Sequence, residues 1–334
     1  MDQTRRCAII ANEDRYDDQK RGSMTDVFFD PPRNDEAWRK MIYDGDIIGL
    51  SPTPEMLALV EHTRSMIEDA FAPLDPQRAH ESLAVERCVE ILTVLKPSYI
   101  HNPRTKELIK AVLSAFGCSP DKTYQDVPRL RCAFPRDYLT TGIAYAHHPH
   151  RDTWYSAPMC QFNWWAPMYE FVSENGMAFH PRYWNRGVKN GSHDFNYYRW
   201  NAESRKNAAQ HISRDTRVQP HAEEPLELEP DVRFVVPPGG IIVFSGAQLH
   251  STVPNTTQIV RWSIDFRTVN IDDVTSKRGA PNTDSASTGT SLRDFLRVAD
   301  FSPIPEEIVA AYDDGVPKGG VAVFKPEMTG AAES

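Results

Sequence analysis

The first third of the chain repeats apolar residues at the three- and four-residue spacing of a helix face. The pattern begins at Thr53, which with Pro54 gives the threonine N-cap and first-turn proline typical of a helix start. It continues through three segments, over residues 53–67, 83–95 and 103–116. Residues 1–50 are polar and irregular by contrast. We expect residues 1–126 to form an irregular segment followed by helices that buttress a sheet.

From about residue 127 the pattern changes to short apolar segments separated by proline and glycine. Repeated segments of this length are typical of the strands of an antiparallel sandwich or barrel. We expect strands at residues 129–134, 142–147, 160–166, 176–181, 232–236, 241–244 and 258–269. The predicted fold class is therefore α+β, with a barrel core over residues 127–270.

Two polar stretches interrupt or follow this strand pattern. An insertion at residues 185–230 contains one candidate helix, at residues 200–211. Because such a long loop inside a compact domain is usually functional or mobile, we expect it to act as a lid. Residues 271–334 are predicted to be a C-terminal extension, flexible through residues 276–291 and then helical at residues 291–299.

Composition and charge restrict the class of protein. Hydrophobic residues make up 40% and charged residues 25% of the chain, as is ordinary for a globular protein. The net charge of −9 disfavours general binding to nucleic acids or anionic membranes. No segment approaches the ~18 apolar residues of a membrane span, and the N-terminus lacks a signal-peptide core. We expect a cytoplasmic monomer or homodimer that acts on a small molecule, without nucleic-acid or membrane partners.

The cysteines support the same compartment. Their number is odd and no two form a C-x-x-C pair, which disfavours a disulfide scaffold or a zinc site made of cysteines. Reduced thiols are therefore expected at Cys7, Cys88, Cys118, Cys132 and Cys160.

The tripeptide His150-Arg151-Asp152, followed much later by His250, is the most informative polar pattern. Residues i and i+2 of a strand point to the same face, so His150 and Asp152 could both face a barrel interior. His250 comes just after the predicted strand at residues 241–244. Two imidazoles and one carboxylate can hold one face of an Fe(II) ion and leave the opposite face open. The same three ligands could also hold zinc.

The segment at residues 259–269 alternates regularly between polar and apolar side chains. Its apolar face fits packing against helices, while its polar face carries Arg261, Ser263, Asp265 and Arg267. An edge strand with a solvated face would show the same alternation. Next to a metal site, however, a buried arginine could clamp the carboxylate of a 2-oxo acid.

With these residues the chain resembles the phytanoyl-CoA dioxygenase-like branch of the Fe(II)/2-oxoglutarate-dependent oxygenases. The family's H-x-D…H pattern matches His150, Asp152 and His250, and its 2-oxoglutarate arginine follows the distal histidine at the offset of Arg261. A hydroxyl residue two positions after the distal histidine corresponds to Thr252. Ser263 matches an Arg-x-Ser variant of the family. Both the metal-binding and the 2-oxoglutarate-binding residues of the family therefore have counterparts in this chain.

The resemblance covers roughly residues 127–270. It includes the run from Asn175 to Pro181, which looks like the family's Asn-Gly-x-Leu…Pro run, and the turn at Pro238-Gly239. One departure is clear, because the family's usual Pro-Gly-Ser-His is replaced by Pro181-Arg182-Tyr183-Trp184. This departure concerns the substrate side of the pocket and leaves the metal side intact.

The resemblance implies a double-stranded β-helix, the jelly-roll barrel of cupin-like proteins. It implies that His150, Asp152 and His250 bind Fe(II) and that 2-oxoglutarate and O2 are co-substrates. The distal carboxylate of 2-oxoglutarate would pair with Arg261, assisted by Ser263 or Thr252. Because Asp152 keeps its carboxylate, hydroxylation, desaturation or oxidative cyclisation is favoured over halogenation, with release of succinate and CO2.

Further candidates lie on neighbouring strands. Gln161, Asn163 and Trp165 alternate, and facing inward they could contact 2-oxoglutarate (Gln161) or substrate (Asn163 and Trp165), although buried amides often only satisfy backbone groups. Arg129 and Arg131 alternate too and, together with Arg267, could grip an acidic substrate or form salt bridges at the surface. The substrate is predicted to be a small acidic or amino-acid-like metabolite, such as an intermediate of secondary metabolism.

Three alternatives use the same residues. A cupin-like dioxygenase that needs no 2-oxo acid would recruit His148, which shares strand parity with His150, as an extra ligand. A barrel that binds a metal or small molecule without catalysis would not need Arg261 beside the metal. A protein kinase is excluded, because Ala157 stands where the asparagine of the His-Arg-Asp loop is required.

Overall fold

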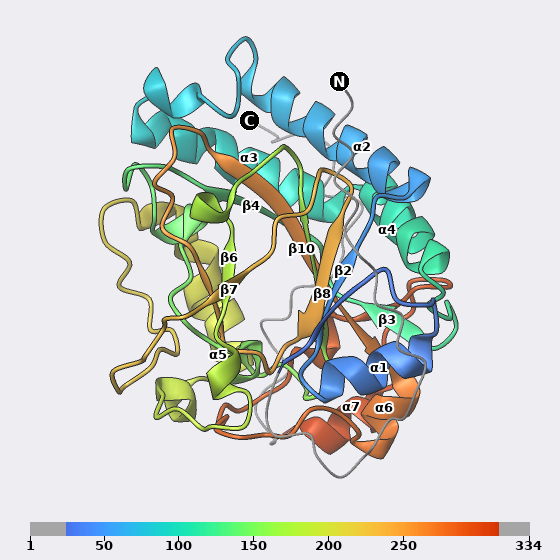
Figure 1. The fold of residues 1–334 in the computed structure, drawn as a ribbon. Coiled ribbons are helices and arrows are strands. Elements are labelled where there is room, and N and C mark those ends of the chain that lie inside the picture. The colour runs from blue at the N-terminus through green and yellow to red at the C-terminus, as the bar shows by residue number, and fades with distance from the viewer. Residues whose placement is uncertain (1–24, 314–334) are drawn as a thin grey trace, which may run out of the picture.

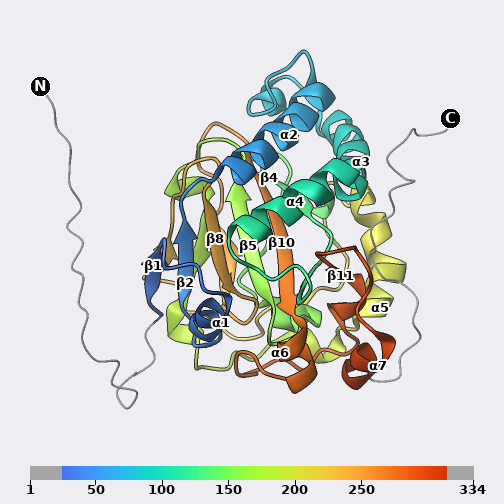
Figure 2. The same ribbon diagram turned by 90° about the vertical axis from the view of Figure 1, so that its right-hand side faces the viewer.

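The computed structural model describes residues 25–313 of the chain. Its α-helices are α1 (Asp35–Tyr43), α2 (Pro54–Phe71), α3 (Val85–His101), α4 (Pro103–Ala115), α5 (Tyr197–Arg199), α6 (Ile271–Ser276) and α7 (Glu306–Val309). Helices α2, α3 and α4 lie across one face of a large sheet (Figure 2). They are the three helices predicted from the apolar spacing, so that prediction is confirmed.

Eleven strands of the described residues form two sheets. They are β1 (Val27–Phe29), β2 (Ile47–Leu50), β3 (Thr123–Gln125), β4 (Arg129–Ala133), β5 (Phe162–Pro167), β6 (Met177–Phe179), β7 (Val232–Arg233), β8 (Ile241–Ser245), β9 (His250–Thr252), β10 (Arg261–Asn270) and β11 (Leu296–Arg297). The large sheet has the order β1-β2-β8-β5-β10-β3-β11, with β4 also paired to β10. The small sheet has the order β7-β6-β9. Apart from the parallel β1–β2 pair, the pairs are antiparallel.

Side-chain caps explain where two of the covering helices begin. The hydroxyl of Thr53 accepts a hydrogen bond from the backbone N–H of Met56 (3.2 Å) at the start of α2. The amide oxygen of Asn102 accepts one from the N–H of Arg104 (2.8 Å) at the start of α4. Each cap satisfies a backbone donor that the first helical turn leaves unpaired. The apolar faces of both helices then bury against the large sheet.

The other face of the large sheet looks toward the small sheet (Figure 1). An apolar cluster joins the two, and the rings of Phe179 on β6 and Phe244 on β8 meet edge to face at 4.9 Å. Trp165 on β5 and Ile242 on β8 belong to the same cluster. The fold is therefore α+β, with two antiparallel sheets that enclose an interior and helices on the outer face of one of them.

Two predictions about the chain's elements are wrong. Residues 142–147 do not form a strand, because Gly142 has φ +58 and begins a 3-10 turn, and a side chain there would collide with carbonyl oxygens of the insertion. The segment before residue 50 is not irregular throughout, since β1, α1 and β2 occupy residues 27–50. The run Ile47–Leu50 is fully buried, yet four residues are too few for a periodic signal.

The large sheet also crosses the predicted segment boundaries. It takes β1, β2 and β3 from residues 1–126 and β11 from the C-terminal extension. The predicted helix at residues 291–299 is instead a 3-10 turn, Ser291–Asp294, followed by β11. The candidate helix at residues 200–211 is a series of π and 3-10 turns. The prediction for Cys7 lies outside the described residues.

Among residues 25–313, no helix combines the length and the apolar character that crossing a membrane would require.

Candidate metal centre

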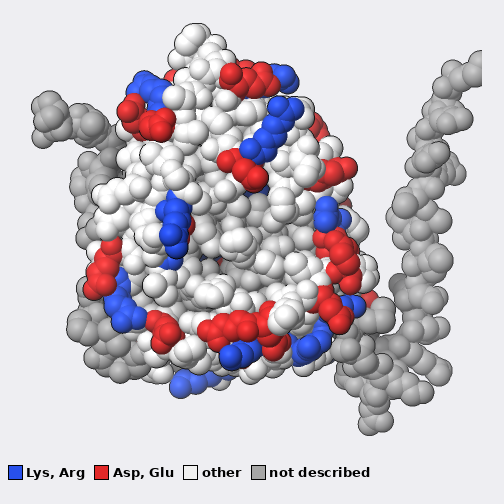
Figure 3. Space-filling view, turned by 90° about the vertical axis from the view of Figure 1, so that its left-hand side faces the viewer, with Lys and Arg blue, Asp and Glu red and all other residues white. Residues whose placement is uncertain are grey.

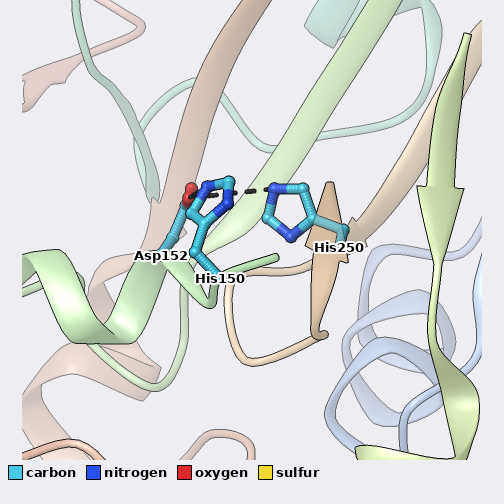
Figure 4. Close-up of side chains that lie close together, drawn as sticks. All are labelled: His150, Asp152 and His250. Atoms are coloured by element: carbon cyan, nitrogen blue, oxygen red, sulfur yellow. Dashed lines mark ion pairs between the residues drawn. The ribbon is translucent and has the colours of Figure 1, made fainter. Parts of the chain in front are cut away.

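The structure brings His150, Asp152 and His250 together, and their ligand atoms all lie within 4.8 Å of one another. His150 and His250 form an antiparallel bridge in which each backbone N–H donates to the other's carbonyl at 3.0 Å. Asp152 stands at the start of a 3-10 turn, Asp152–Tyr155. The three side chains point toward one another (Figure 4). A bridge and a turn therefore position the ligands, in place of the regular strand predicted before His150.

The orientation of both imidazoles is fixed by backbone carbonyls. Nδ1 of His150 donates to the carbonyl oxygen of His148 (2.8 Å), and Nδ1 of His250 donates to that of Gln248 (3.0 Å). A carbonyl can only accept, so each neutral ring carries its hydrogen on Nδ1 and presents a lone pair on Nε2. Both Nε2 atoms face Oδ1 of Asp152, at 3.5 and 4.0 Å.

Asp152 is turned so that only one of its oxygens faces the histidines. Oδ2 accepts a hydrogen bond from Nε2 of Gln161 (3.1 Å) and lies 3.6 Å from Nε of Arg267. Burial raises the pKa of this carboxyl, but hydrogen bonding and the positive charge that the two histidines carry when protonated outweigh it and lower the pKa to about 2. The carboxylate is therefore ionised at neutral pH.

Three lone-pair-bearing atoms converge on one point with no hydrogen between them, which is the arrangement a metal cation satisfies. Burial, reinforced by the neighbouring His150, lowers the pKa of His250 to about 4, so its ring is neutral at pH 7 as a ligand must be. Second contacts of the ligands with carbonyl or amide groups are also usual in metal sites. The residues present therefore fit a divalent metal ion held by two nitrogens and one oxygen.

His147, which was not predicted as a ligand, lies closer to the centre than its neighbour His148. The ring of His147 stacks on that of His150 at 4.8 Å, and burial lowers its pKa well below the ordinary value. Its Nδ1 is buried without a hydrogen-bond partner among the described residues. His148 contributes its backbone carbonyl, and its exposed imidazole does not join the ligand group. The extra ligand required by the alternative without a 2-oxo acid is therefore not present at this position.

Arg261 is a buried arginine with no carboxylate partner within ion-pair distance among residues 25–313. Its Nε donates to the carbonyl oxygen of Asn175 (3.0 Å), and Nη1 donates to the hydroxyl of Ser263. The guanidinium lies over the ring of Trp165, with 5.4 Å between its central carbon and the ring centroid. Burial lowers the pKa of Arg261 to about 10, so the side chain remains charged at neutral pH.

Asn175 contacts Arg261 through its backbone carbonyl, and this contact was not predicted from the sequence. Its side chain is fully buried, accepts a hydrogen bond from the N–H of Val172 (3.1 Å) and donates to Thr257 (3.3 Å). Its carbonyl is thereby aimed at Arg261. The Asn-Gly run of the resemblance was a signal for this position, although it did not reveal the role. Thr252 lies on β9, on the same strand face as His250.

The other three predicted arginines differ from Arg261, because each has a carboxylate partner inside the protein. Arg129 pairs with Asp126, and Arg131 pairs with Asp265 through Nε (2.6 Å). Arg267 lies 3.4 Å from Asp126 and 3.3 Å from Asp265. Burial raises the pKa of Asp126, and the charge of Arg129 opposes this rise. The positive charges of the three arginines are thus largely neutralised within the protein. These arginines therefore no longer support the prediction of an acidic substrate.

Gln161 and Asn163 face the interior as predicted, but they contact each other and the metal ligand. The amide of Gln161 donates to Oδ1 of Asn163 (2.9 Å) as well as to Asp152. Both side chains are buried. Their visible role is to orient the carboxylate of Asp152.

A cavity of about 470 Å³ lies between the segment that carries His150 and the second half of the insertion. Tyr145 and His148 line one side, and Asp215, Arg217 and Glu224 line the other. Asp215 is committed to Arg217, whose Nε donates to it at 2.9 Å. Glu224 makes no hydrogen bond or ion pair with any residue that the structure describes. The cavity has the size of a small-molecule site and walls of mixed polarity.

Among known proteins, the chain is similar to several solved structures. No protein-family model and no curated protein matches the chain. EvdO2 from Micromonospora carbonacea var. aurantiaca, also solved in complex with 2-oxoglutarate, shares 14% identity over 71% of this chain and 91% of its own, with a TM-score of 0.42. AviO1 from Streptomyces viridochromogenes Tue57 shares 14% identity over 75% of this chain and 99% of its own, with a TM-score of 0.36.

A third similar structure is SnoN, a non-heme alpha-ketoglutarate-dependent epimerase from nogalamycin biosynthesis. It shares 10% identity over 71% of this chain and 84% of its own, with a TM-score of 0.33. At identities and scores of this size, the function of the present chain has to be argued from its own residues.

Proposed function

We propose that this chain is an Fe(II)- and 2-oxoglutarate-dependent oxygenase that oxidises a small molecule. The observation that carries the proposal is the pairing of two features on one interior surface. A group of two histidines and one carboxylate fits a metal, and Arg261 stands on the same face of β10 as Arg267, which reaches Asp152. A buried cation without a carboxylate partner is costly unless an anion joins it.

Different residues of the chain would bind the metal and the co-substrate. His150, Asp152 and His250 would hold the iron, while Gln161 and the two backbone carbonyls keep the ligands in place. Bound Fe(II) would supply activation of dioxygen coupled to the oxidation of 2-oxoglutarate to succinate and CO2. The three protein ligands leave coordination positions for these co-substrates.

Arg261 would bind the distal carboxylate of 2-oxoglutarate. Its guanidinium is held by the carbonyl of Asn175 and stacked on Trp165, so it is pre-oriented before the anion arrives. Ser263, already bonded to Nη1, would donate its hydroxyl hydrogen to the same carboxylate. Thr252 is proposed as a second hydroxyl for this co-substrate, and Gln161 is proposed to act through Asp152.

We further infer that the two facing sheets form the double-stranded β-helix expected of such enzymes. The proposed core spans residues 127–270, with the insertion at residues 185–230 as its lid. Residues 1–126 and 271–334 would then be its flanking parts, although both contribute strands to the large sheet.

The substrate is proposed to enter through the cavity beside His148 and to be a small polar molecule. Asn163, Trp165, Arg131 and Arg267 remain candidates for contacting it from the interior. Because these arginines have carboxylate partners and Glu224 has no partner among residues 25–313, the site does not favour an anion over an uncharged molecule. The face on which the insertion lies carries acidic and basic side chains mostly toward its edges and a largely uncharged centre (Figure 3). Hydroxylation, desaturation and oxidative cyclisation all remain compatible with this site.

An anaerobic titration tests the proposal without knowledge of the substrate. Addition of Fe(II) and then 2-oxoglutarate to the purified protein should produce a visible charge-transfer band, and oxygen should then yield succinate. The variant His150→Ala should produce neither, because one of three ligands is missing. A wild-type protein that binds Fe(II) but shows no band and forms no succinate would favour the non-catalytic metal-binding alternative.

A further inference from the structure

Arg151, the residue between His150 and Asp152, makes its contacts outside the candidate ligand group and is almost completely buried, with 1% of its side chain exposed. Its Nη1 donates to the carbonyl oxygen of Ala247, just before the strand of His250. Its Nη2 donates to the carbonyl oxygens of Tyr183, just before the insertion, and Arg186, near its start. Its Nε donates to Asp284 of the C-terminal extension (3.0 Å). One guanidinium thus joins four parts of the chain.

Asp284 collects the complementary set of contacts. Besides Arg151, it accepts hydrogen bonds from Nε1 of Trp154 (2.7 Å), in the turn that Asp152 begins, and from the N–H of Val188 (3.0 Å), in the insertion. Its side chain is 5% exposed. The pair is therefore a buried ion pair in which each member makes further hydrogen bonds, a condition under which such a pair can hold its surroundings in one arrangement.

The segment that carries Asp284 was expected to be flexible. It nevertheless makes further hydrogen bonds to residues 153–156, which follow Asp152 in the chain. The hydroxyl of Ser285 donates to the carbonyl of Thr153 (2.6 Å), and that of Ser287 donates to the same oxygen (3.0 Å). The N–H of Ser156 donates to Ser287 in turn (3.1 Å). The extension thus closes over the outer side of the loop that presents Asp152.

We propose that Arg151 and Asp284 are positioning residues of the metal centre, and that the C-terminal extension and the insertion are thereby structural parts of it. His150 and Asp152 flank Arg151 on the same short backbone segment, so fixing the arginine fixes the separation of their ligand atoms. The contact to Ala247 fixes the approach of the strand that bears His250. The inference rests on the proposed metal binding, but it concerns affinity for the metal and does not depend on 2-oxoglutarate or on catalysis.

A matched pair of arginine substitutions tests this role. Arg151→Lys keeps the charge but cannot reach four partners with one planar group. Arg39→Lys makes the same change in another buried pair, Arg39–Asp273 (2.7 Å), which joins α1 to α6 on the helix-covered side of the large sheet. For each variant the dissociation constant for Fe(II) is measured anaerobically, and the melting temperature is measured on the metal-free protein.

Both substitutions should lower the melting temperature, because both weaken a buried ion pair. Only Arg151→Lys should also weaken Fe(II) binding, by about 10- to 100-fold, the range typical of contacts that orient metal ligands. Equal Fe(II) affinity in wild type and Arg151→Lys, or an equal loss in Arg39→Lys, would overturn the inference. If wild type itself binds no Fe(II), the proposed function fails together with it.

A second substitution keeps the test decisive if Arg151→Lys does not fold. Asp284→Asn leaves the three carbonyl contacts of Arg151 intact and removes only the opposite charge and its fixed geometry. It should weaken Fe(II) binding in the same direction, and Asp273→Asn is its control. Unchanged Fe(II) affinity in a folded Asp284→Asn protein would show that the extension is not part of the metal centre.

Discussion

The arginines at the two ends of the interior surface formed by β4 and β10 differ in whether they have a carboxylate partner. At one end, Arg129 and Arg267 share the carboxylate of Asp126 within the protein. At the other end, Arg261 is more deeply buried, and among residues 25–313 its contacts are a carbonyl, a hydroxyl and an aromatic ring. A paired arginine stabilises the folded structure, whereas Arg261, which has no carboxylate partner among residues 25–313, is proposed to bind an anion. Sequence alternation alone gives both ends the same pattern, although their proposed functions differ.

This difference predicts that replacing arginine by methionine lowers stability at one end of the surface and 2-oxoglutarate affinity at the other. Arg129→Met should cause the largest loss of stability, because it leaves Asp126 buried without its shortest ion pair. Breaking a buried pair in this way costs about 3–5 kcal/mol. Urea denaturation of the metal-free protein measures the loss. Affinity for 2-oxoglutarate should stay near that of wild type, and a large drop in that affinity would erase the distinction.

Arg261→Met should instead act on the co-substrate. Removal of the buried cation that is proposed to bind the distal carboxylate should weaken 2-oxoglutarate binding by about 2–5 kcal/mol, at least ~30-fold. The free energy of unfolding should change little, since no carboxylate of the protein loses its partner. Anaerobic titration of the Fe(II)-loaded variant measures the affinity, and Fe(II) binding itself is the control. Loss of iron to the same extent would show that Arg261 supports the metal site.

The burial of His250, which outweighs the attraction of Asp152, should also show itself in the pH dependence of stability. The unfolded chain takes up a proton at this histidine near pH 6.5, whereas the folded metal-free protein does so only near pH 4. Stability from this residue is therefore complete above pH 6.5 and is lost as the pH falls to about 4, by about 3 kcal/mol. Denaturation of wild type and His250→Gln across this range measures it. Parallel curves for the two proteins would contradict the assignment.

The smallest effect is expected from Ser263→Ala. The variant loses one hydroxyl that bonds Nη1 of Arg261 and is proposed to bond 2-oxoglutarate. One hydrogen bond contributes about 1 kcal/mol, so affinity for 2-oxoglutarate should fall about five-fold, well below the effect of Arg261→Met. A matched substitution on the opposite face of the same strand, Thr268→Val, also removes one hydroxyl and should leave that affinity unchanged. An effect of Ser263→Ala as large as that of Arg261→Met would mean that the two residues act as one unit.

Much of the fold was predictable because its signals are local. The N-cap of Thr53, the apolar spacing of α2, α3 and α4, and the alternation along β10 each lie within one stretch of sequence. The predicted strand at residues 142–147 failed because contacts with the distant insertion impose a turn at Gly142. Strand β2 was missed because its burial comes from its neighbour β8, which lies far along the chain.

For the site, the sequence by itself determined which side chains are available: two histidines and a carboxylate, and an arginine with a serine on one strand face. Only the tertiary structure decided which arginines are paired, which oxygen of Asp152 faces the histidines, and that Arg151 binds Asp284 across 133 residues. The physical reason is that charge pairing and burial depend on partners distant in sequence, whereas residue type and strand parity are set along the chain itself.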